Sequence, residues 1–434
     1  MLAPLSVRFV LIALALGGAA VSARASGMIS LLNMAFEGNP LLQSQTRLIG
    51  AAQADVKGAQ WQFYPTPSAS VEQVNASSGD PSYSNRDGRV ITFRLQQPLW
   101  TAGRLTAGVS RAEASVAVAQ AQWEESRQQL ALRTISAWGE WKAGEQKSLA
   151  LQESVQTHQR LVALINRRVE GGLSAVADAV LARGRLEQVQ AEAQVAQAQQ
   201  ASALARLEQL TGRRFEGATL ESLAIRPVEP VLELARSLDK AWLNSPVATK
   251  LQAQIRQQEM DLEIRKAQVM PEVYARAEHQ QGSFSAGGPS SSNRFFIGLS
   301  ATPGAGLSAQ SAVEAAVARV QALQAEVESS RRNLIEQVTL EHVSALAQLQ
   351  RRQSLEAGLS LTRDIVASWD RQFLAGRKTW VEVMNAAREL AQAQTALAEV
   401  NVAYVMATWR LAVLAEGVPA VLSGLGPAAA APTR

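Results

Sequence analysis

An internal duplication constrains the fold of this chain most strongly. The stretch AFEGNPLLQSQ at 35–45 resembles AWLNSPVATKL at 241–251, and EGGLSAVADAVLARGRLEQ at 170–188 resembles LAGRKTWVEVMNAARELAQ at 374–392. Both pairs are offset by roughly 205 residues, which is far longer than the period of a solenoid repeat. The sequence therefore predicts two copies of one large unit.

The domain boundaries follow from this duplication. Two prolines in the stretch FEGATLESLAIRPVEP mark the join between the copies, because proline interrupts a helix. We expect a signal peptide at 1–25, a first structural repeat at 26–214, an inter-repeat linker at 215–233, a second structural repeat at 234–418 and an Ala/Pro-rich C-terminal tail at 419–434.

Each repeat has the same predicted order of helices. A helix of about 25 residues begins at Pro40, and at Pro246 in the second copy, and ends before the next proline. Long helices without proline follow at about 104–170 and 307–373, and shorter ones at about 174–211 and 378–416. Residues at 3-4 spacing in the two shorter helices predict a coiled-coil seam. The seam residues are Leu186, Val189, Ala193, Ala196, Gln200, Ala203, Leu207 and Leu210, and Leu390, Ala393, Leu397, Val400, Tyr404, Ala407, Leu411 and Leu414.

Two pairs of strand-like segments alternate apolar and polar residues. They are expected at 66–78 and 89–99, and at 271–281 and 293–303. Their length suits a membrane-crossing strand of about 9–11 residues. The last segment alternates one residue out of phase with its counterpart, which suggests a β-bulge.

Four strands are too few to close a barrel alone. An open sheet edge in lipid leaves backbone groups unpaired, and bacterial barrels have at least about 8 strands. The barrel would therefore be shared between chains. A dimer would supply eight strands and a trimer twelve, and helices of roughly 100 Å around a hole favour the trimer. Loops 79–88 and 282–292 would face outward.

Aromatic residues gather beside the first strand pair. The group consists of Trp61, Phe63, Tyr64 and Trp100. Their position suits an interfacial girdle at one end of a barrel. Ordinary core packing where helix meets sheet explains them equally well.

The N-terminus reads as a secretory signal. Arg8 precedes a short apolar run, and Ala23-Arg24-Ala25 offers a cleavage site. A buried N-terminal helix is the alternative. The chain has no cysteine, which excludes a lipoprotein anchor and disulfides. No other apolar run of about 18 residues is evident, so we expect no membrane-spanning helix.

The sequence offers no enzyme chemistry. Its three histidines, His158, His279 and His342, lack metal-ligand spacing, and no phosphate-binding loop occurs. The net charge of +4 is small for 434 residues and gives no sign of nucleic-acid binding. We expect no enzyme, no cofactor and no metal. A secreted structural coiled-coil protein remains an alternative, although it leaves the duplicated strand pairs unexplained.

The chain resembles the TolC family of outer-membrane factors. The resemblance rests on the duplication together with the motifs EGNPLL, QPLWTAGRLTAG, GGLSAVADAV and AGRKTWVEVMNAARELAQA. It implies a mainly α fold with a membrane β-barrel: a homotrimer with a twelve-stranded barrel, continued by a periplasmic α-helical barrel. It also implies location in the outer membrane of a Gram-negative bacterium, with the helical part in the periplasm.

The resemblance further implies a function in export. The chain would conduct substrate passively from an inner-membrane transporter and its periplasmic adaptor to the outside. The tip QFLAGRKTWVEVMNAAREL looks most like the branch that serves type I secretion of adhesins, where the transporter is an ABC exporter. A multidrug or metal efflux pump, with a proton-driven transporter, is the alternative.

Two sets of residues carry the implied site. The adaptor would contact the helix tips at Gly172, Leu173, Ser174, Gly376 and Arg377. For the glycines, a purely structural role in the tight reversal between helices is the competing explanation.

The second set matches the family's periplasmic gate. Asp178 and Lys378 match polar tether positions, Glu382 matches a first acidic ring, and Asn385 stands where a second acid is usual. The usual partner of Asp178 is a tyrosine, but Phe373 occupies that place and has no hydrogen-bonding group. We hypothesise that Asp178 and Lys378 still contribute, including to each other. The alternative is that Lys378 and Glu382 form a solvated i, i+4 pair worth about 0.2–0.5 kcal/mol.

Overall fold

The computed structural model describes residues 26–73, 89–228, 233–284, 288–302, 304 and 308–423. The expected signal peptide at 1–25, the loop at 79–88, part of the loop at 282–292 and most of the tail at 419–434 lie outside these residues. Contacts divide the chain into two compact units. Unit 1 takes Met1–Leu42, Glu125–Ser245 and Arg332–Arg434, and unit 2 takes Gln43–Glu124 and Pro246–Arg331. Each unit draws segments from both sequence repeats.

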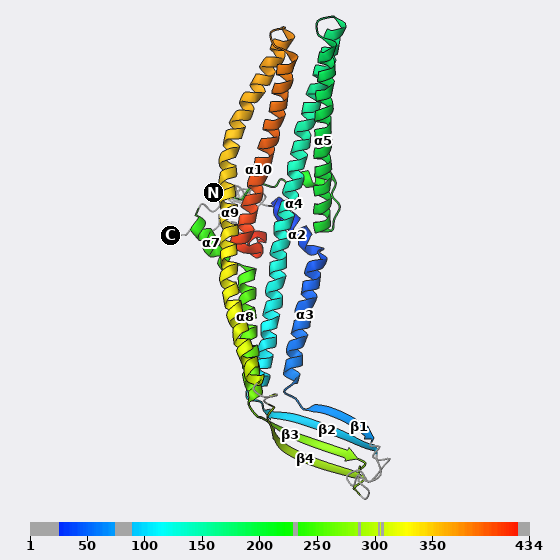
Figure 1. The fold of residues 1–434 in the computed structure, drawn as a ribbon, viewed down its shortest axis with the longest axis vertical. Helices are drawn as coiled ribbons and strands as arrows, with labels where there is room; N and C mark the ends of the chain where they lie inside the picture. The colour runs from blue at the N-terminus through cyan, green and yellow to red at the C-terminus, as the bar shows by residue number, and fades with distance from the viewer. Residues whose placement is uncertain are drawn as a thin grey trace, which may run out of the picture. The chain divides into compact units, whose positions relative to one another are not determined.

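Helices make up most of the described chain (Figure 1). They are α2 (Ser26–Glu37), α3 (Pro40–Trp61), α4 (Arg104–Glu170), α5 (Val176–Thr211), α6 (Gly217–Glu221), α7 (Leu234–Leu243), α8 (Pro246–Val269), α9 (Ser308–Leu374) and α10 (Trp380–Leu422). The six helices predicted from the sequence are confirmed within a few residues, apart from the C-terminal end of α10.

Three short helices and one helix end were not anticipated. The amphipathic helices α2 and α7 precede the prolines that begin α3 and α8, and α6 lies inside the expected linker. Helix α10 continues beyond the expected end at 416. Gly417 has a φ of 77° there, which kinks the chain before it resumes a helical path through Pro419. Glycine tolerates this left-handed conformation without the steric cost of a side chain.

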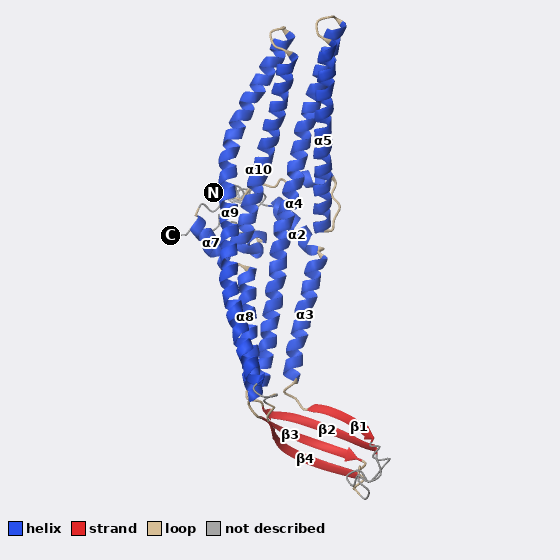
Figure 2. Ribbon diagram, viewed as in Figure 1, coloured by secondary structure: helices blue, strands red, loops and turns tan. Residues whose placement is uncertain are grey.

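The four strands form one antiparallel sheet in the order β1-β2-β3-β4 (Figure 2). Their bounds are β1 (Thr66–Gln73), β2 (Arg89–Trp100), β3 (Glu272–Gln281) and β4 (Ser291–Ser300). Because β2 pairs with β3, the strand pair of one repeat joins the strand pair of the other. Residues 74–78 of the first predicted strand lie outside the described residues. The last begins two residues earlier than expected, and residues 301 and 302 are not in it.

The expected bulge lies in β2. Pro98 pairs with Tyr274 and Trp100 with Val273, so Leu99 is an extra residue in β2. The pairing of β3 with β4 runs without such a shift from Glu272↔Ser300 to Gln281↔Ser291. The pattern predicted a bulge without assigning it to either strand, and the structure has it in β2.

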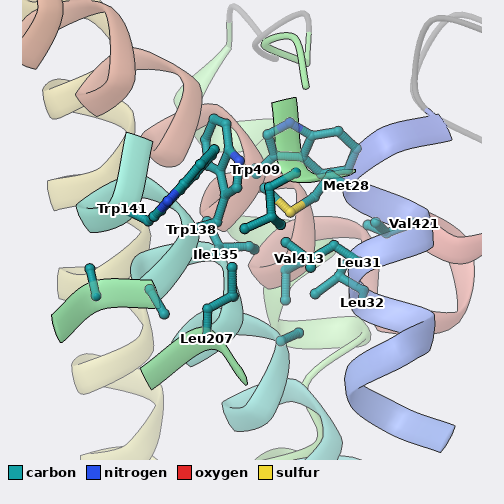
Figure 3. Close-up of a cluster of buried hydrophobic side chains, with 14 of the residues drawn as sticks. Met28, Leu31, Leu32, Ile135, Trp138, Trp141, Leu207, Trp409, Val413 and Val421 are labelled. Carbon is teal, nitrogen blue, oxygen red and sulfur yellow. The ribbon is translucent and has the colours of Figure 1, made fainter. Parts of the chain in front are cut away.

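The main core of unit 1 collects large side chains from helices far apart in the sequence. Figure 3 shows them converging from α2, α4, α5 and α10. Its most buried members include Met28, Leu31, Ile135, Trp141 and Leu207, each at most 2% exposed. The predicted seam residues of α5 and α10 are all buried or half-buried, which is consistent with a coiled-coil seam. Small residues let the helices approach closely: the Cα atom of Gln200 lies 3.1 Å from where a Cβ on Gly144 would be.

Helix α10 is long and apolar enough to cross a membrane by length and composition alone. The expectation that no such segment exists was therefore wrong on composition. However, 56% of its most apolar window is buried inside the structure. A buried core helix passes the same test, and Trp409 and Val413 of α10 pack in the core of unit 1.

Candidate functional site

The two helical hairpins of unit 1 turn in the same way. After α4, the Leu173 amide donates to Arg168 O at 2.7 Å and the Gly172 amide to Val169 O at 3.0 Å. After α9, the Arg377 amide donates to Gln372 O at 2.9 Å and the Gly376 amide to Phe373 O at 3.0 Å. This pair of bonds is a Schellman motif, which needs a left-handed residue. Gly172 and Gly376 supply it, with φ of 70° and 73°.

The residues expected to meet an adaptor lie at these turns. Gly172, Leu173, Gly376 and Arg377 are exposed, and Ser174 is half-buried. The Leu173 side chain is 72% exposed although it is apolar. The glycines thus have the structural role that competes with adaptor contact. The Leu173 amide takes part in the same turn, but the Leu173 side chain is largely exposed.

Three consecutive side-chain contacts fix the start of α10. Thr379 caps the helix: its hydroxyl accepts from the Glu382 amide at 3.4 Å, and the Glu382 carboxylate accepts from the Thr379 amide at 2.9 Å. Lys378 Nζ donates to Glu382 Oε1 at 2.7 Å. The Lys378 ammonium also lies 4.4 Å from the ring centroid of Trp369 on α9. Lys378 therefore bridges the two helices of this hairpin.

These contacts perturb the acidity of Glu382. The hydrogen bond from Lys378, followed by the bonds from the Thr379 amide and hydroxyl, lowers the pKa of Glu382 from 4.5 to about 2. At pH values above 4.5, the charged Glu382 carboxylate therefore stabilises the start of α10. This stabilisation is lost as pH falls from 4.5 towards about 2. Glu382 is consequently a fixed negative charge at neutral pH.

Asp178 and Lys378 do not bind each other within this chain. The Asp178 carboxylate accepts from the Ala175 amide at 3.2 Å and so completes the first turn of α5. Lys378 is bound to Glu382, as in the i, i+4 pair that was the alternative interpretation. Asn385 lies one turn after Glu382 and is exposed.

An apolar cluster joins the two hairpins near their tips. It contains Leu161, Val162, Ile165, Ala179, Ala182, Phe373, Trp380, Val383 and Met384. Phe373 is only 3% exposed, and the Arg168 guanidinium lies 5.4 Å from the centroid of its ring. Arg168 Nε is buried and has no hydrogen-bond partner among the described residues. Phe373 thus contacts the first hairpin through its ring face, where the tyrosine of the resembled family has a hydroxyl.

Sequence reasoning missed Arg168 and Trp369. Each lies near the end of a long helix, one turn from its tip, and neither matches a recognised motif. A cation and an aromatic ring at those places were the only available signal. Among the described residues, no group of three or more His, Asp or Glu side chains could hold a metal ion.

The aromatic group of unit 2 lies on the surface of the described chain. Trp61, Phe63, Tyr64 and Trp100 are 68%, 44%, 58% and 52% exposed. The rings of Trp61 and Tyr64 lie 5.1 Å apart. This exposure argues against the alternative of core packing within one chain.

Comparison with known proteins identifies relatives of this chain. Residues 31–213 and 237–415 match the outer membrane efflux protein family. Protein CyaE of Bordetella pertussis (strain Tohama I) is 25% identical over 264 residues. That alignment covers 59% of this chain and 55% of CyaE, so it spans about half of the relative's length.

Solved structures share the fold. The outer-membrane channel OprN matches with a TM-score of 0.78 and 17% identity, covering 92% of this chain and 91% of OprN. The outer membrane protein VceC from Vibrio cholerae matches with a TM-score of 0.74 and 16% identity, covering 90% and 96%. The Campylobacter jejuni CmeC outer membrane channel gives a TM-score of 0.76 and 13% identity, covering 90% and 86%.

Proposed function

This chain belongs to the outer membrane efflux protein family, and we propose that it is the outer-membrane duct of a tripartite export machine. The family consists of outer-membrane channels, not enzymes, so the outer membrane is the location of this chain. In the proposed machine the duct conducts substrate passively. A periplasmic adaptor joins it to an inner-membrane transporter.

The sheet of unit 2 carries this proposal. Its outer strands, β1 and β4, each have one edge without a neighbour in the described chain. One face exposes large apolar residues, among them Phe93 at 51%, Phe295 at 84% and Ile297 at 82%. An apolar face suits lipid, and lipid forbids open strand edges, so the strands of other chains must complete the sheet. Three chains would form the twelve-stranded barrel.

We therefore expect a homotrimer. The purified chain in mild detergent should have the mass of three protomers, measured by light scattering with correction for bound detergent. A monodisperse monomer that still conducts in bilayers would contradict the shared barrel.

The tips of the hairpins form the proposed periplasmic gate. In a symmetric trimer the three Glu382 carboxylates would surround the pore, and a ring of carboxylates favours cations. The low pKa of Glu382 supports this role, because the ring stays charged under all physiological conditions. Because Asn385 occupies the second ring position in the next turn, this gate would be less negative than a gate with two acidic rings. Lys378 and Asp178 would hold the hairpin starts in the closed arrangement.

Planar-bilayer recordings test the gate. Glu382→Ala should weaken cation selectivity and block by divalent cations, whereas Lys378→Ala and Asp178→Ala should raise the open conductance. In the wild-type channel, cation selectivity should persist as pH falls through 4.5, because the hydrogen bonds from Lys378 and Thr379 lower the pKa of Glu382. If all three variants match the wild type, the gate lies elsewhere and this stretch is only a helix tip.

We infer that the machine serves type I secretion of a large protein such as an adhesin. The motif QFLAGRKTWVEVMNAAREL supports this assignment, with an ABC exporter as the inner-membrane partner. The family description favours the second candidate, an efflux pump with a proton-driven transporter. In either machine the adaptor would bind at the turns around Gly172 and Gly376.

Deleting the gene separates the two candidates. Loss of a surface adhesin with unchanged drug and metal tolerance is the result expected for secretion. Drug or metal hypersensitivity with a normal adhesin would overturn that assignment in favour of efflux. Complementation with the wild-type gene provides the control for polar effects on neighbouring genes.

A further inference from the structure

The polar face of the sheet in unit 2 carries a concentrated positive charge that the gate proposal does not use. Cross-strand pairing places Arg94, Glu278 and Arg294 in one row across β2, β3 and β4. Arg276 occupies the neighbouring row on the same face, opposite Gln96 and Phe296. Because side chains alternate along a strand, these residues share one face, and the exposed apolar residues Phe93, Leu95, Phe295 and Ile297 occupy the other.

The single carboxylate in this group is shared between two arginines. Glu278 Oε2 lies 3.6 Å from Arg94 Nε and 3.7 Å from Arg276 Nε. Both distances suit an ion pair but exceed a hydrogen bond. Arg276 Nε is buried and has no hydrogen-bond partner among the described residues. Three arginines against one glutamate leave each chain with two uncompensated positive charges in these two rows.

The neighbouring side chains do not neutralise this positive charge. Arg294 donates to the neutral groups Gln280 Oε1 at 2.6 Å and Ser292 Oγ at 3.2 Å. The Arg276 guanidinium lies 4.4 Å from the centroid of the Phe296 ring, which holds it without neutralising it. Two other acids lie on this face of the described strands. Glu72 pairs with Val90, away from the arginine rows, and Glu272 pairs with Ser300 and is bound to Arg104 by two hydrogen bonds. The Arg94 side chain remains 44% exposed.

We propose that this arginine band, defined by Arg94, Arg276 and Arg294, is a binding surface for acidic stretches of the polypeptide that passes through the duct. The inference rests on the proposed function, because the polar face lines the pore only if the apolar face meets lipid in a shared barrel. Three chains then present nine arginines against three Glu278 carboxylates. A guanidinium fork matches a carboxylate, so acidic side chains are its natural partners.

The location of the band gives it a distinct effect. Glu278 and Arg294 lie near the ends of β3 and β4 that adjoin the 282–290 loop, whereas Glu382 lies at the hairpin tips of unit 1. In the proposed duct the barrel opens to the outside, so a chain that leaves through it meets this positive charge last. Attraction between acidic segments and the band holds the emerging chain at this end and disfavours its return.

Block of single channels by poly-L-glutamate tests the proposal. The polymer is added to the loop side of the trimer in a planar bilayer, and poly-L-lysine of equal length is the comparison. Polyglutamate should block the wild-type channel at lower concentration than polylysine. Arg94→Gln and Arg294→Gln should each raise the blocking concentration of polyglutamate, by about tenfold for the three charges removed per trimer.

Glu278→Gln provides a control of opposite sign. It removes the shared carboxylate and should lower the blocking concentration, which a variant that merely misfolds cannot do. His279→Gln lies on the apolar face next to Glu278 and should behave as wild type. Equal block of the wild type, Arg94→Gln and Glu278→Gln would overturn the proposal, as would selectivity for chloride without block by polyglutamate. Failure of the chain to trimerise or conduct would instead refute the proposed function.

Discussion

Replacing Trp141 with alanine should lower the free energy of unfolding of unit 1 by about 3–5 kcal/mol, the usual cost of emptying a large aromatic site. Trp141 is only 2% exposed and lies in the core cluster that joins α2, α4, α5 and α10 (Figure 3). Neighbouring members such as Ile135 and Leu207 are almost fully buried, so the surroundings have little freedom to collapse into the space.

Chemical denaturation followed by circular dichroism in mild detergent measures this change. Trp141→Phe is the matched control, because it keeps an aromatic ring and most of the volume. It should lose clearly less stability than the alanine variant. If both variants unfold at the same denaturant concentration as the wild type, the cluster contributes little to stability and the described packing does not hold unit 1 together.

Replacing Phe373 with alanine should raise the population of the open gate by at least about tenfold, since a Phe→Ala change in a buried cluster commonly costs several kcal/mol. Phe373 is the member of α9 in the apolar cluster shared with the first hairpin, and Arg168 of α4 lies over its ring. Loss of the ring removes both the apolar contact and the cation–π contact between hairpins. This prediction rests on the proposed gate.

Two further variants separate the contributions at this contact. Arg168→Met keeps an apolar side chain of similar length but removes the cation, so it should open the gate less than Phe373→Ala. Leu374→Ala changes the adjacent residue, which is 65% exposed, and should leave the closed conductance unchanged. Open-channel fractions in planar bilayers give the comparison. A Phe373→Ala channel as tightly closed as the wild type would show that the contact does not hold the gate.

The sequence alone predicted much of the architecture because its signals are local. Pro40 and Pro246 marked the starts of α3 and α8, and the proline-free stretch within each repeat predicted the long helices α4 and α9. Alternation of apolar and polar residues predicted all four strands, and spacing along α5 and α10 predicted their buried seams. The glycines of the hairpin turns were recognised for the same reason, since a left-handed residue is required at one position of the turn.

The tertiary structure decided which of these residues meet. Pairing of β2 with β3 joins the two repeats into one sheet and creates the row of Arg94, Glu278 and Arg294, which no local pattern contains. The bulge proved to lie at Leu99 because register depends on both strands, whereas a sequence comparison sees only their relative phase.

At the hairpin tips, the sequence named most of the residues but not their partners. Asp178 and Lys378 have separate partners within the chain, and Phe373 contacts Arg168 from a segment about 200 residues away. Caps and i, i+4 pairs are set by spacing along one helix, so a sequence can reveal them. Contacts between helices depend on how each is rotated and packed against its neighbours, and this is fixed only when the whole core is assembled.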